Sequence, residues 1–195
     1  MNNPDNTISI VIHGRGGQGA KTAAMLLAEV AISLGRYAQA FPEYGPERSG
    51  APVKAYIRIS DKAIRTHQPI INPDIVIIID DSLLDFISVT DGIKPDSTIV
   101  INTNNSEVTK KKLKLPKGFF GKIAVVNATA IALERIGANK SNTATLAATL
   151  KVMDFIKFNE FQQEAKSILI HKLGKEKTDQ NMLAIKDAFE EVKVI

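Results

Sequence analysis

A short β-branched run followed directly by a glycine-rich loop constrains this chain more than any other feature. Residues 8–13 (ISIVIH) have the length and composition of a β-strand, and residues 14–19 (GRGGQG) follow without a break. Apolar residues then recur at helical spacing from Ala20 to Leu34, and Gly35 stands where helices commonly end. The opening therefore predicts a strand, a tight glycine turn and a helix, which is the first unit of an α/β fold.

Later segments repeat this alternation of strands and helices. Residues 53–60 alternate between apolar and polar side chains and predict a half-exposed strand. Three apolar runs end in polar residues and predict buried strands, at residues 75–80, 98–102 and 122–127. Amphipathic segments predict helices at residues 128–137, 142–158, 160–173 and 179–192. We therefore predict one Rossmann-like, three-layer α/β domain over residues 1–195, with a mostly parallel sheet, helices on both faces and a helical C-terminal third.

Composition excludes several kinds of site. The 195 residues contain no cysteine, so the chain has no disulfide, thiolate zinc site, cysteine-ligated iron–sulfur cluster or cysteine nucleophile. The three histidines are far apart and lack the spacing of metal ligands. Asp80 and Asp81 follow a buried strand and could hold a metal or act as a base, but such acids more often cap the next helix, as Asp81 or Ser82 would here. We predict no metal site and no catalytic residue.

The net charge of +4 is concentrated in one stretch, which contains Lys110, Lys111, Lys112, Lys114 and Lys117. We interpret this stretch as a solvated basic loop or a rim that faces an acidic partner, because a nucleic-acid site would interleave arginines and aromatic residues. No apolar run approaches the roughly 20 residues of a membrane span, and the N-terminus lacks the basic region of a secretory signal. We expect a cytoplasmic protein that binds neither nucleic acid nor membrane.

The glycine loop matches the pattern G-x-G-x-x-G through Gly14, Gly16 and Gly19, with Gly17 as a further glycine. In this context the pattern indicates dinucleotide binding, because glycines let backbone amides approach a phosphate at a helix N-terminus. However, dinucleotide-binding proteins bind the ribose with an acid at the end of the second strand. Here that strand is predicted near residues 37–40, and the acid that follows it, Glu43, lies beyond a proline in a predicted loop. A nucleotide-triphosphate loop is also disfavoured, because Ala20 displaces Lys21 by one position. A structural turn, another anionic ligand and a partner-facing loop remain open.

Residues 41–52 (FPEYGPERSGAP) form a second candidate loop. The three prolines and two glycines predict a rigid, shaped connection, although a solvated surface loop is the alternative. Ligands of α/β proteins bind outside the carboxyl ends of the strands, and we expect both loops to emerge there.

The two loops together closely resemble the gamma subunit of 2-oxoacid:ferredoxin oxidoreductases, and residues 73–84 and 127–148 extend the resemblance. The resemblance implies an assembled enzyme that oxidatively decarboxylates a 2-oxoacid, with pyruvate favoured, transfers the acyl group to coenzyme A and reduces ferredoxin. It implies that thiamine diphosphate, Mg²⁺ and the iron–sulfur clusters belong to alpha, beta and delta partner subunits. This chain would carry no cofactor and would help shape the coenzyme A region.

The same resemblance assigns site residues. We expect the loops to face the active centre of the assembly through Gly14, Gly16, Gly17, Gln18, Gly19, Tyr44, Gly45, Pro46, Glu47, Arg48 and Gly50. Relatives often have a second arginine where this chain has Ser49, which lowers the local positive charge. The alternative function is a stand-alone dinucleotide-binding enzyme or regulator.

Overall fold

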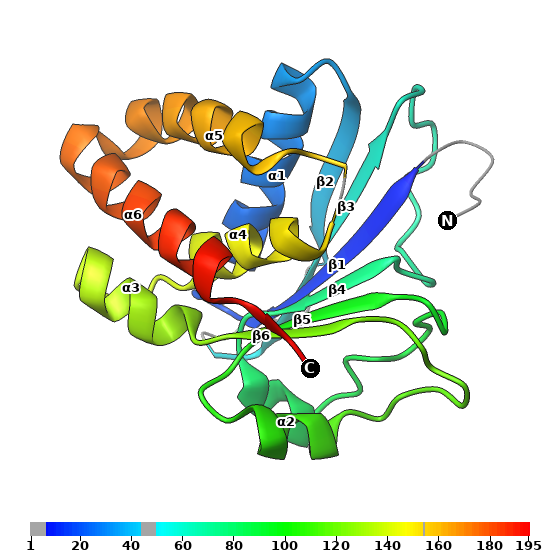
Figure 1. Ribbon diagram of the computed structural model, residues 1–195. Coiled ribbons are helices and arrows are strands. Elements are labelled where there is room, and N and C mark those ends of the chain that lie inside the picture. Colours follow the sequence, from blue (N-terminus) through cyan, green and yellow to red (C-terminus); the bar gives the residue numbers. More distant parts are fainter. Residues whose placement is uncertain (1–6, 44–49, 154) are drawn as a thin grey trace.

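The computed structural model describes residues 7–43, 50–153 and 155–195, and arranges them as a twisted sheet covered by helices (Figure 1). The strands are β1 (Ile8–Arg15), β2 (Tyr37–Glu43), β3 (Pro52–Ser60), β4 (Ile75–Ile78), β5 (Thr98–Asn102), β6 (Ile123–Val126) and β7 (Lys193–Val194). The helices are α1 (Ala20–Ser33), the 3₁₀ helix η1 (Asp81–Asp85), α2 (Ser106–Lys112), α3 (Ala128–Ile136), α4 (Asn142–Val152), α5 (Phe158–Leu173) and α6 (Lys175–Glu191).

The sheet has the strand order β2-β3-β1-β4-β5-β6-β7. Strands β1, β4, β5 and β6 are parallel neighbours, whereas β3 is antiparallel to both β1 and β2, and β7 is antiparallel to β6. The α/β class is confirmed, but the prediction of a mostly parallel sheet is only partly confirmed. The physical reason is the connection between β2 and β3, because residues 44–51 are too few for the crossover that parallel strands need.

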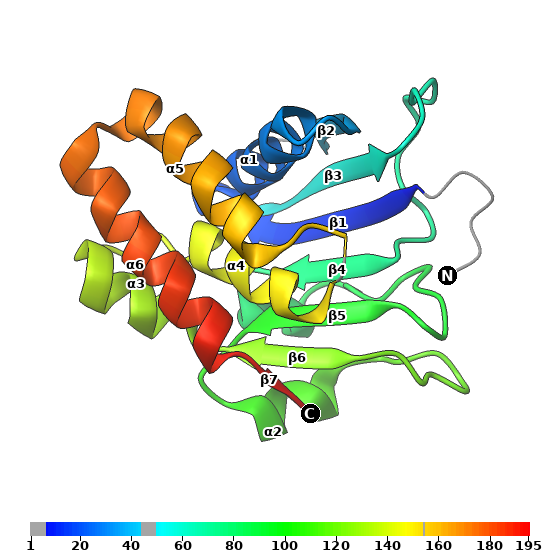
Figure 2. The same cartoon turned by 45° about the horizontal axis from the view of Figure 1, so that its top comes forward.

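Helices cover both faces of the sheet, but unequally (Figures 1 and 2). Helices α1 and α4 pack directly on one face, and α3, α5 and α6 lie on the same side, packed against these two helices and one another. Helices α2 and η1 lie on the other side of the sheet. Strand β4 is a continuous apolar run because both of its faces are covered. Ile75 and Ile77 pack in the core under α1 and α4, and Val76 and Ile78 pack in the core under η1.

The prediction that β3 is half exposed is wrong. Tyr56 and Arg58, on its supposedly open side, retain only 4% and 7% of their exposure. The ring of Phe41 on β2 lies 5.2 Å from that of Tyr56, and the Arg58 guanidinium lies over Phe41 and donates to the Gln68 carbonyl oxygen. Strand β2 and the segment 61–74 therefore bury Tyr56 and Arg58, although the polarity of these side chains predicted that they would face solvent.

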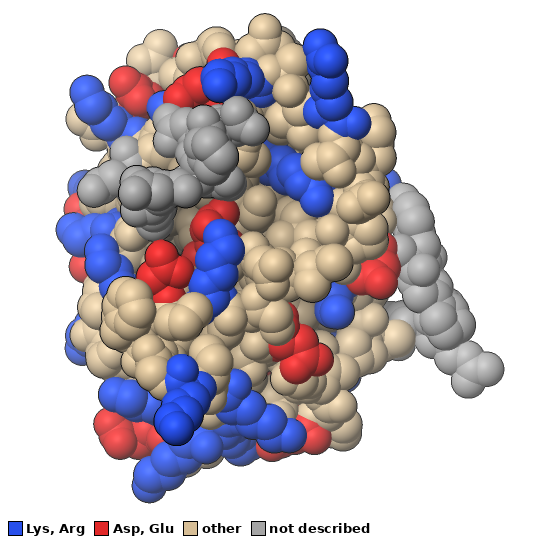
Figure 3. All heavy atoms as spheres, turned by 90° about the vertical axis from the view of Figure 1, so that its right-hand side faces the viewer, with Lys and Arg blue, Asp and Glu red and all other residues tan. Residues whose placement is uncertain are grey.

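The lysine stretch is also partly helical, where a loop was predicted. The Asn105 side chain accepts a hydrogen bond from the Val108 amide and starts α2, and Lys110, Lys111 and Lys112 occupy the last turn of α2. Cations in a last turn are stabilised by the helix dipole. Figure 3 shows Lys and Arg side chains gathered at the lower end of the molecule, where α2 lies in Figure 1.

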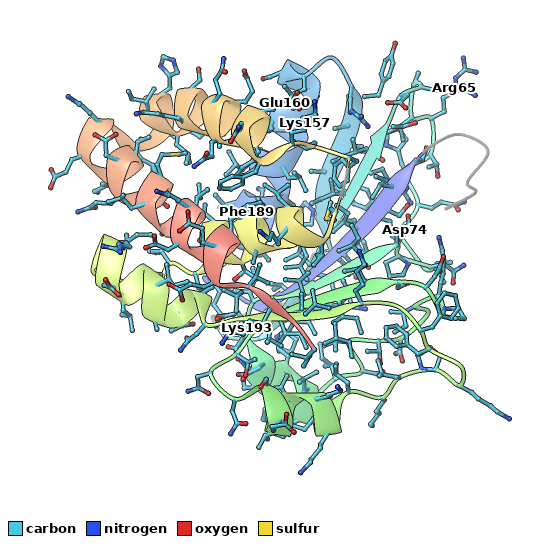
Figure 4. All side chains as sticks on the ribbon, viewed as in Figure 1. Arg65, Asp74, Lys157, Glu160, Phe189 and Lys193 are labelled. Carbon is cyan, nitrogen blue, oxygen red and sulfur yellow. The ribbon has the colours of Figure 1, made fainter. Side chains whose placement is uncertain are left out.

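The C-terminal helices follow their predicted positions, but α4 ends at Val152 rather than at residue 158. Phe158 at the start of α5 stacks on Phe189 of α6 at 3.7 Å, and the Lys151 ammonium of α4 lies 4.6 Å from the same ring. Phe189 thus lies where the three helices meet (Figure 4). Within the described ranges, every helix is too short or too polar to cross a bilayer.

Candidate functional site

The glycine loop joins the carboxyl end of β1 to the amino end of α1, as the sequence predicts. Gly17 and Gly19 adopt φ values of +93° and +83°, which L side chains rarely adopt. Gly19 directly precedes α1, and its carbonyl oxygen accepts the first helical hydrogen bond from the Ala23 amide. The loop therefore exposes backbone at a helix N-terminus, which suits an anionic group.

The start of β3 lies directly against this loop. The Gly16 amide donates to the Ala51 carbonyl oxygen at 2.8 Å, and the Gly50 amide donates to the Gly16 carbonyl oxygen at 3.2 Å. This places Gly50 beside the glycine loop, as expected for loops at one edge of the sheet. The other candidates of the second loop, Tyr44, Gly45, Pro46, Glu47 and Arg48, lie outside the described residues.

A closed ring of hydrogen bonds fixes the turn from Arg15 to Gln18. The Gln18 side-chain oxygen accepts from the Arg15 amide at 2.7 Å, and its side-chain nitrogen donates to Asp80 Oδ2 at 2.6 Å. The Arg15 guanidinium completes the ring, with Nε 3.3 Å from Asp80 Oδ2. Gln18 therefore has both ends of its amide occupied within the chain.

Asp80 anchors this ring and also caps η1. Its Oδ1 accepts from the amide and the hydroxyl of Ser82, at 3.0 and 2.6 Å. Burial raises the pKa of Asp80, but the hydrogen bonds from Ser82 and Gln18 and the charge of Arg15 outweigh burial and lower it. The capping residue is thus Asp80, and not Asp81 or Ser82 as predicted. Asp81 accepts from the Thr103 hydroxyl at 2.6 Å, and the described residues contain no cluster of three metal-ligating side chains.

A cavity of about 500 Å³ opens beside the glycine loop, between α1, α4, α5 and α6. Gly17, Gly19 and Asn142 form part of its lining. Its apolar wall is formed by Ile136, Leu169 and Leu173, and its cations are Lys140, Lys172 and Lys177. Lys172 pairs with Glu29 at 2.6 Å, whereas Lys140 and Lys177 have no ion-pair partner among the described residues. The cavity therefore combines apolar walls with cations that are not neutralised within the described part of the chain.

Helix α4 begins at the same place. Asn142, its first residue, is 8% exposed and donates from Nδ2 to the Gly19 carbonyl oxygen at 3.3 Å. Two helix N-termini, those of α1 and α4, therefore converge on the cavity, and both favour negative charge.

A second, smaller cavity of about 240 Å³ lies at the carboxyl ends of β4, β5 and β6. Polar side chains line it, and Gln18 belongs to the lining of both cavities. The hydrogen-bonded carboxylates of Asp80 and Asp81 are its acidic groups. The two cavities offer binding groups, and in the smaller one the Thr103 hydroxyl is held by the Asp81 carboxylate and by the Thr109 hydroxyl.

The structure disfavours dinucleotide binding. In a dinucleotide-binding fold the acid that holds the ribose ends the strand beside β1. The prediction that Glu43 lies in a loop is wrong, because β2 extends through Pro42 and ends at Glu43. However, β3 separates β1 from β2, and the Glu43 carboxylate accepts a hydrogen bond from the Tyr56 hydroxyl. The nearest acid to the expected position is therefore one strand too far away and already engaged.

Sequence reasoning missed Arg15, Asn142, Lys140 and Lys177 as parts of this site. Arg15 lies inside the glycine motif, so its position was a signal that could have included it. Asn142 and Gly19 are 123 positions apart, and nothing local in the sequence pairs them.

The comparisons with known proteins agree with one another. A family model described as pyruvate ferredoxin/flavodoxin oxidoreductase matches residues 9–191. The pyruvate/ketoisovalerate oxidoreductases common subunit gamma of Pyrococcus furiosus is 43% identical over 189 residues, with 96% of this chain and 98% of that protein covered. The crystal structure of pyruvate oxidoreductase subunit PORC from Thermotoga maritima matches with a TM-score of 0.82 and 37% identity, over 97% of this chain and 98% of that one.

A more distant structure shares the fold. The 2-oxoglutarate:ferredoxin oxidoreductase of Magnetococcus marinus, solved with 2-oxoglutarate, coenzyme A and succinyl-CoA bound, matches with a TM-score of 0.69 and 17% identity. The match covers 94% of this chain but 30% of that longer chain. The fold of nearly all of this chain is therefore also the fold of one part of that longer chain.

Proposed function

Because the chain belongs to the pyruvate ferredoxin/flavodoxin oxidoreductase family, as a gamma subunit, we propose that it shapes the coenzyme A region of a multisubunit 2-oxoacid:ferredoxin oxidoreductase. The assembled enzyme would convert a 2-oxoacid and coenzyme A into acyl-CoA and carbon dioxide while it reduces ferredoxin. The names of the relatives, which cite pyruvate and ketoisovalerate, support pyruvate as the favoured substrate.

We propose alpha, beta and delta subunits as the partners of this chain. Thiamine diphosphate, Mg²⁺ and the iron–sulfur clusters would reside in those partners. The chain itself has no cysteine to ligate a cluster, and its described residues lack a metal-ligating group of three. The reaction chemistry would therefore take place on the partners, and this chain would contribute binding and orientation.

The cavity at the glycine loop is the observation that carries the coenzyme A assignment. Coenzyme A is an elongated ligand with several phosphates and a long, less polar arm. The cavity offers two helix N-termini and the cations of Lys140 and Lys177 for phosphates, and apolar walls for the rest of the ligand. Backbone amides near Gly17 and Gly19 would donate to a phosphate, and the hydrogen bonds of Gln18 to the Arg15 amide and to Asp80 would hold this turn in place.

The test is steady-state kinetics of the assembled enzyme with Lys177→Ala in this subunit. A lost charge-assisted hydrogen bond is worth about 1.5–3 kcal/mol, so we expect KM for coenzyme A to rise roughly 10- to 100-fold while KM for the 2-oxoacid stays unchanged. Lys186→Ala is the matched control, because Lys186 lies on the same helix α6 and pairs with Glu190 at 3.9 Å instead.

Equal KM values for coenzyme A in the Lys177→Ala and Lys186→Ala enzymes would contradict the proposal. Micromolar binding of NAD⁺ or FAD to the isolated chain, measured by calorimetry, would instead favour the stand-alone dinucleotide-binding alternative.

A further inference from the structure

We infer that Arg15 is a positioning residue that joins three separate segments, the glycine loop, the start of β3 and the Asp80 turn, into one rigid unit. The three segments are far apart in sequence and meet only at the carboxyl ends of β1 and β4. The expected effect of Arg15 on KM for coenzyme A rests on the proposed function. The rigidity itself is measured independently of that function.

The contacts of the guanidinium carry this inference. Nη1 of Arg15 donates to the Gly50 carbonyl oxygen at 3.0 Å, and Nη2 and Nε donate to Ser82 Oγ at 2.8 and 3.2 Å. Nε also lies 3.3 Å from Asp80 Oδ2. Each of the three guanidinium nitrogens is thus engaged, and the partners belong to two segments outside the glycine loop.

The main chain of Arg15 also stabilises this unit, through two hydrogen bonds to Gln18. Its amide donates to the Gln18 side-chain oxygen, and its carbonyl oxygen accepts from the Gln18 amide at 3.0 Å. Because Gln18 also donates to Asp80, a shift of the Asp80 turn would pull on the glycine loop through two independent links. The turn that presents Gly16 and Gly17 is therefore held by side chains and not only by its own backbone.

The chemistry of this position requires arginine. A guanidinium is a planar fork of five N–H donors, whereas lysine has a single, strongly hydrated ammonium group. The Cζ atom of Arg15 also lies over the ring of Phe86, 5.2 Å from its centre, and Phe86 is 71% exposed. Lysine could keep the charge next to Asp80 but could not at the same time reach Gly50, Ser82 and Phe86.

The experiment uses the assembled enzyme with Arg15→Ala or Arg15→Lys in this subunit. Arg36→Ala is the control, because Arg36 also pairs with a carboxylate, Asp61 at 3.3 Å, but lies between α1 and β2, away from the glycine loop. Hydrogen–deuterium exchange is followed at the Gly16 and Gly50 amides, which hydrogen-bond between the glycine loop and the start of β3. Kinetics are measured with coenzyme A and with the 2-oxoacid as the varied substrate.

We expect both Arg15 variants to speed exchange at these two amides roughly 5- to 150-fold, which is the loss of one linking interaction of about 1–3 kcal/mol at a tenfold change per 1.4 kcal/mol. KM for coenzyme A should rise about 10-fold with kcat within about 2-fold of the parent. Arg15→Lys should behave like Arg15→Ala in both measurements, and Arg36→Ala like the parent. Arg15→Lys also keeps the inference testable if Arg15→Ala does not assemble.

Unchanged exchange in the Arg15 variants would overturn the inference, whatever the kinetics show. Faster exchange with unchanged KM would also overturn the positioning role, provided that Lys177→Ala raises KM in the same assay. If neither Arg15→Lys nor Lys177→Ala changes KM while exchange accelerates, the rigid unit is supported and the coenzyme A assignment is the part that fails.

Discussion

His13 gives the chain a built-in sensitivity to acid that can be worked out from its surroundings. It lies on β1 next to the glycine loop, is 3% exposed, and its Nδ1 has no hydrogen-bond partner among the described residues. A cavity of about 30 Å³ beside it is also lined by Lys54, Ser88 and Asp91. Burial, the largest cause, and the Lys54 charge together lower the pKa of His13 to about 4 against the opposing effect of Asp91.

The direction in which stability changes with pH follows from whether the folded or the unfolded chain protonates His13 at the higher pH. As pH falls, the unfolded chain protonates His13 near 6.5, whereas the folded chain keeps it neutral until about pH 4. Stability is therefore complete above pH 6.5 and is lost as pH falls through the window from 6.5 to 4. A difference of this size in pKa corresponds to about 3 kcal/mol, which is a large share of the 5–15 kcal/mol typical of a folded domain.

Urea denaturation of the full chain at pH 7.5 and pH 4.5 measures this directly. We expect the free energy of unfolding of the parent to fall by about 2 kcal/mol more than that of His13→Gln between these pH values. Contributions from carboxylates that do not face His13 are common to both proteins and cancel in the difference. His171→Gln is the control, because His171 is exposed in the last turn of α5 and should leave the pH dependence unchanged. Identical pH dependence in the parent and His13→Gln would refute the reasoning.

Two further predictions concern the loop and its anchor. Gly19→Ala places a Cβ 2.7 Å from Asn142 Nδ2 at a φ of +83°, whereas Gly35→Ala has a similar φ of +79° and open space. We expect thermal unfolding to show a loss of about 1 kcal/mol for Gly35→Ala and clearly more for Gly19→Ala; equal losses would show that the Asn142 contact is not limiting. Asp80→Asn should cost about 1–3 kcal/mol at pH 7. Because folding lowers the Asp80 pKa, that cost should shrink as pH falls below about 3.8, the unfolded value, and a pH-independent cost would contradict the proposed role of its charge.

Local patterns predicted the elements well where one signal dominated. The β-branched run before the glycines, the helical spacing after them and the apolar strand 98–102 all appear where they were expected. The strand predicted at residues 75–80 also forms, but it ends at Ile78. The prediction of exposure failed where burial depends on a neighbouring segment. Tyr56 and Arg58 alternate with apolar residues, as in a strand with one face in solvent, but β2 and the 61–74 segment cover them. Periodicity reports the chemistry of one segment and contains no information about what packs on it.

For the candidate site too, local features could be predicted from the sequence and long-range contacts could not. The sequence by itself determined the glycine turn and, through the resemblance of its two loops, the family, because both depend on residues close together in the chain. Only the tertiary structure decided that β3 separates β1 from β2, which removes the ribose-binding acid from the site. It also brought Asp80 to Gln18 across 62 positions and Asn142 to Gly19 across 123. Such contacts are fixed by strand order and helix packing, which are properties of the whole chain and of no local segment.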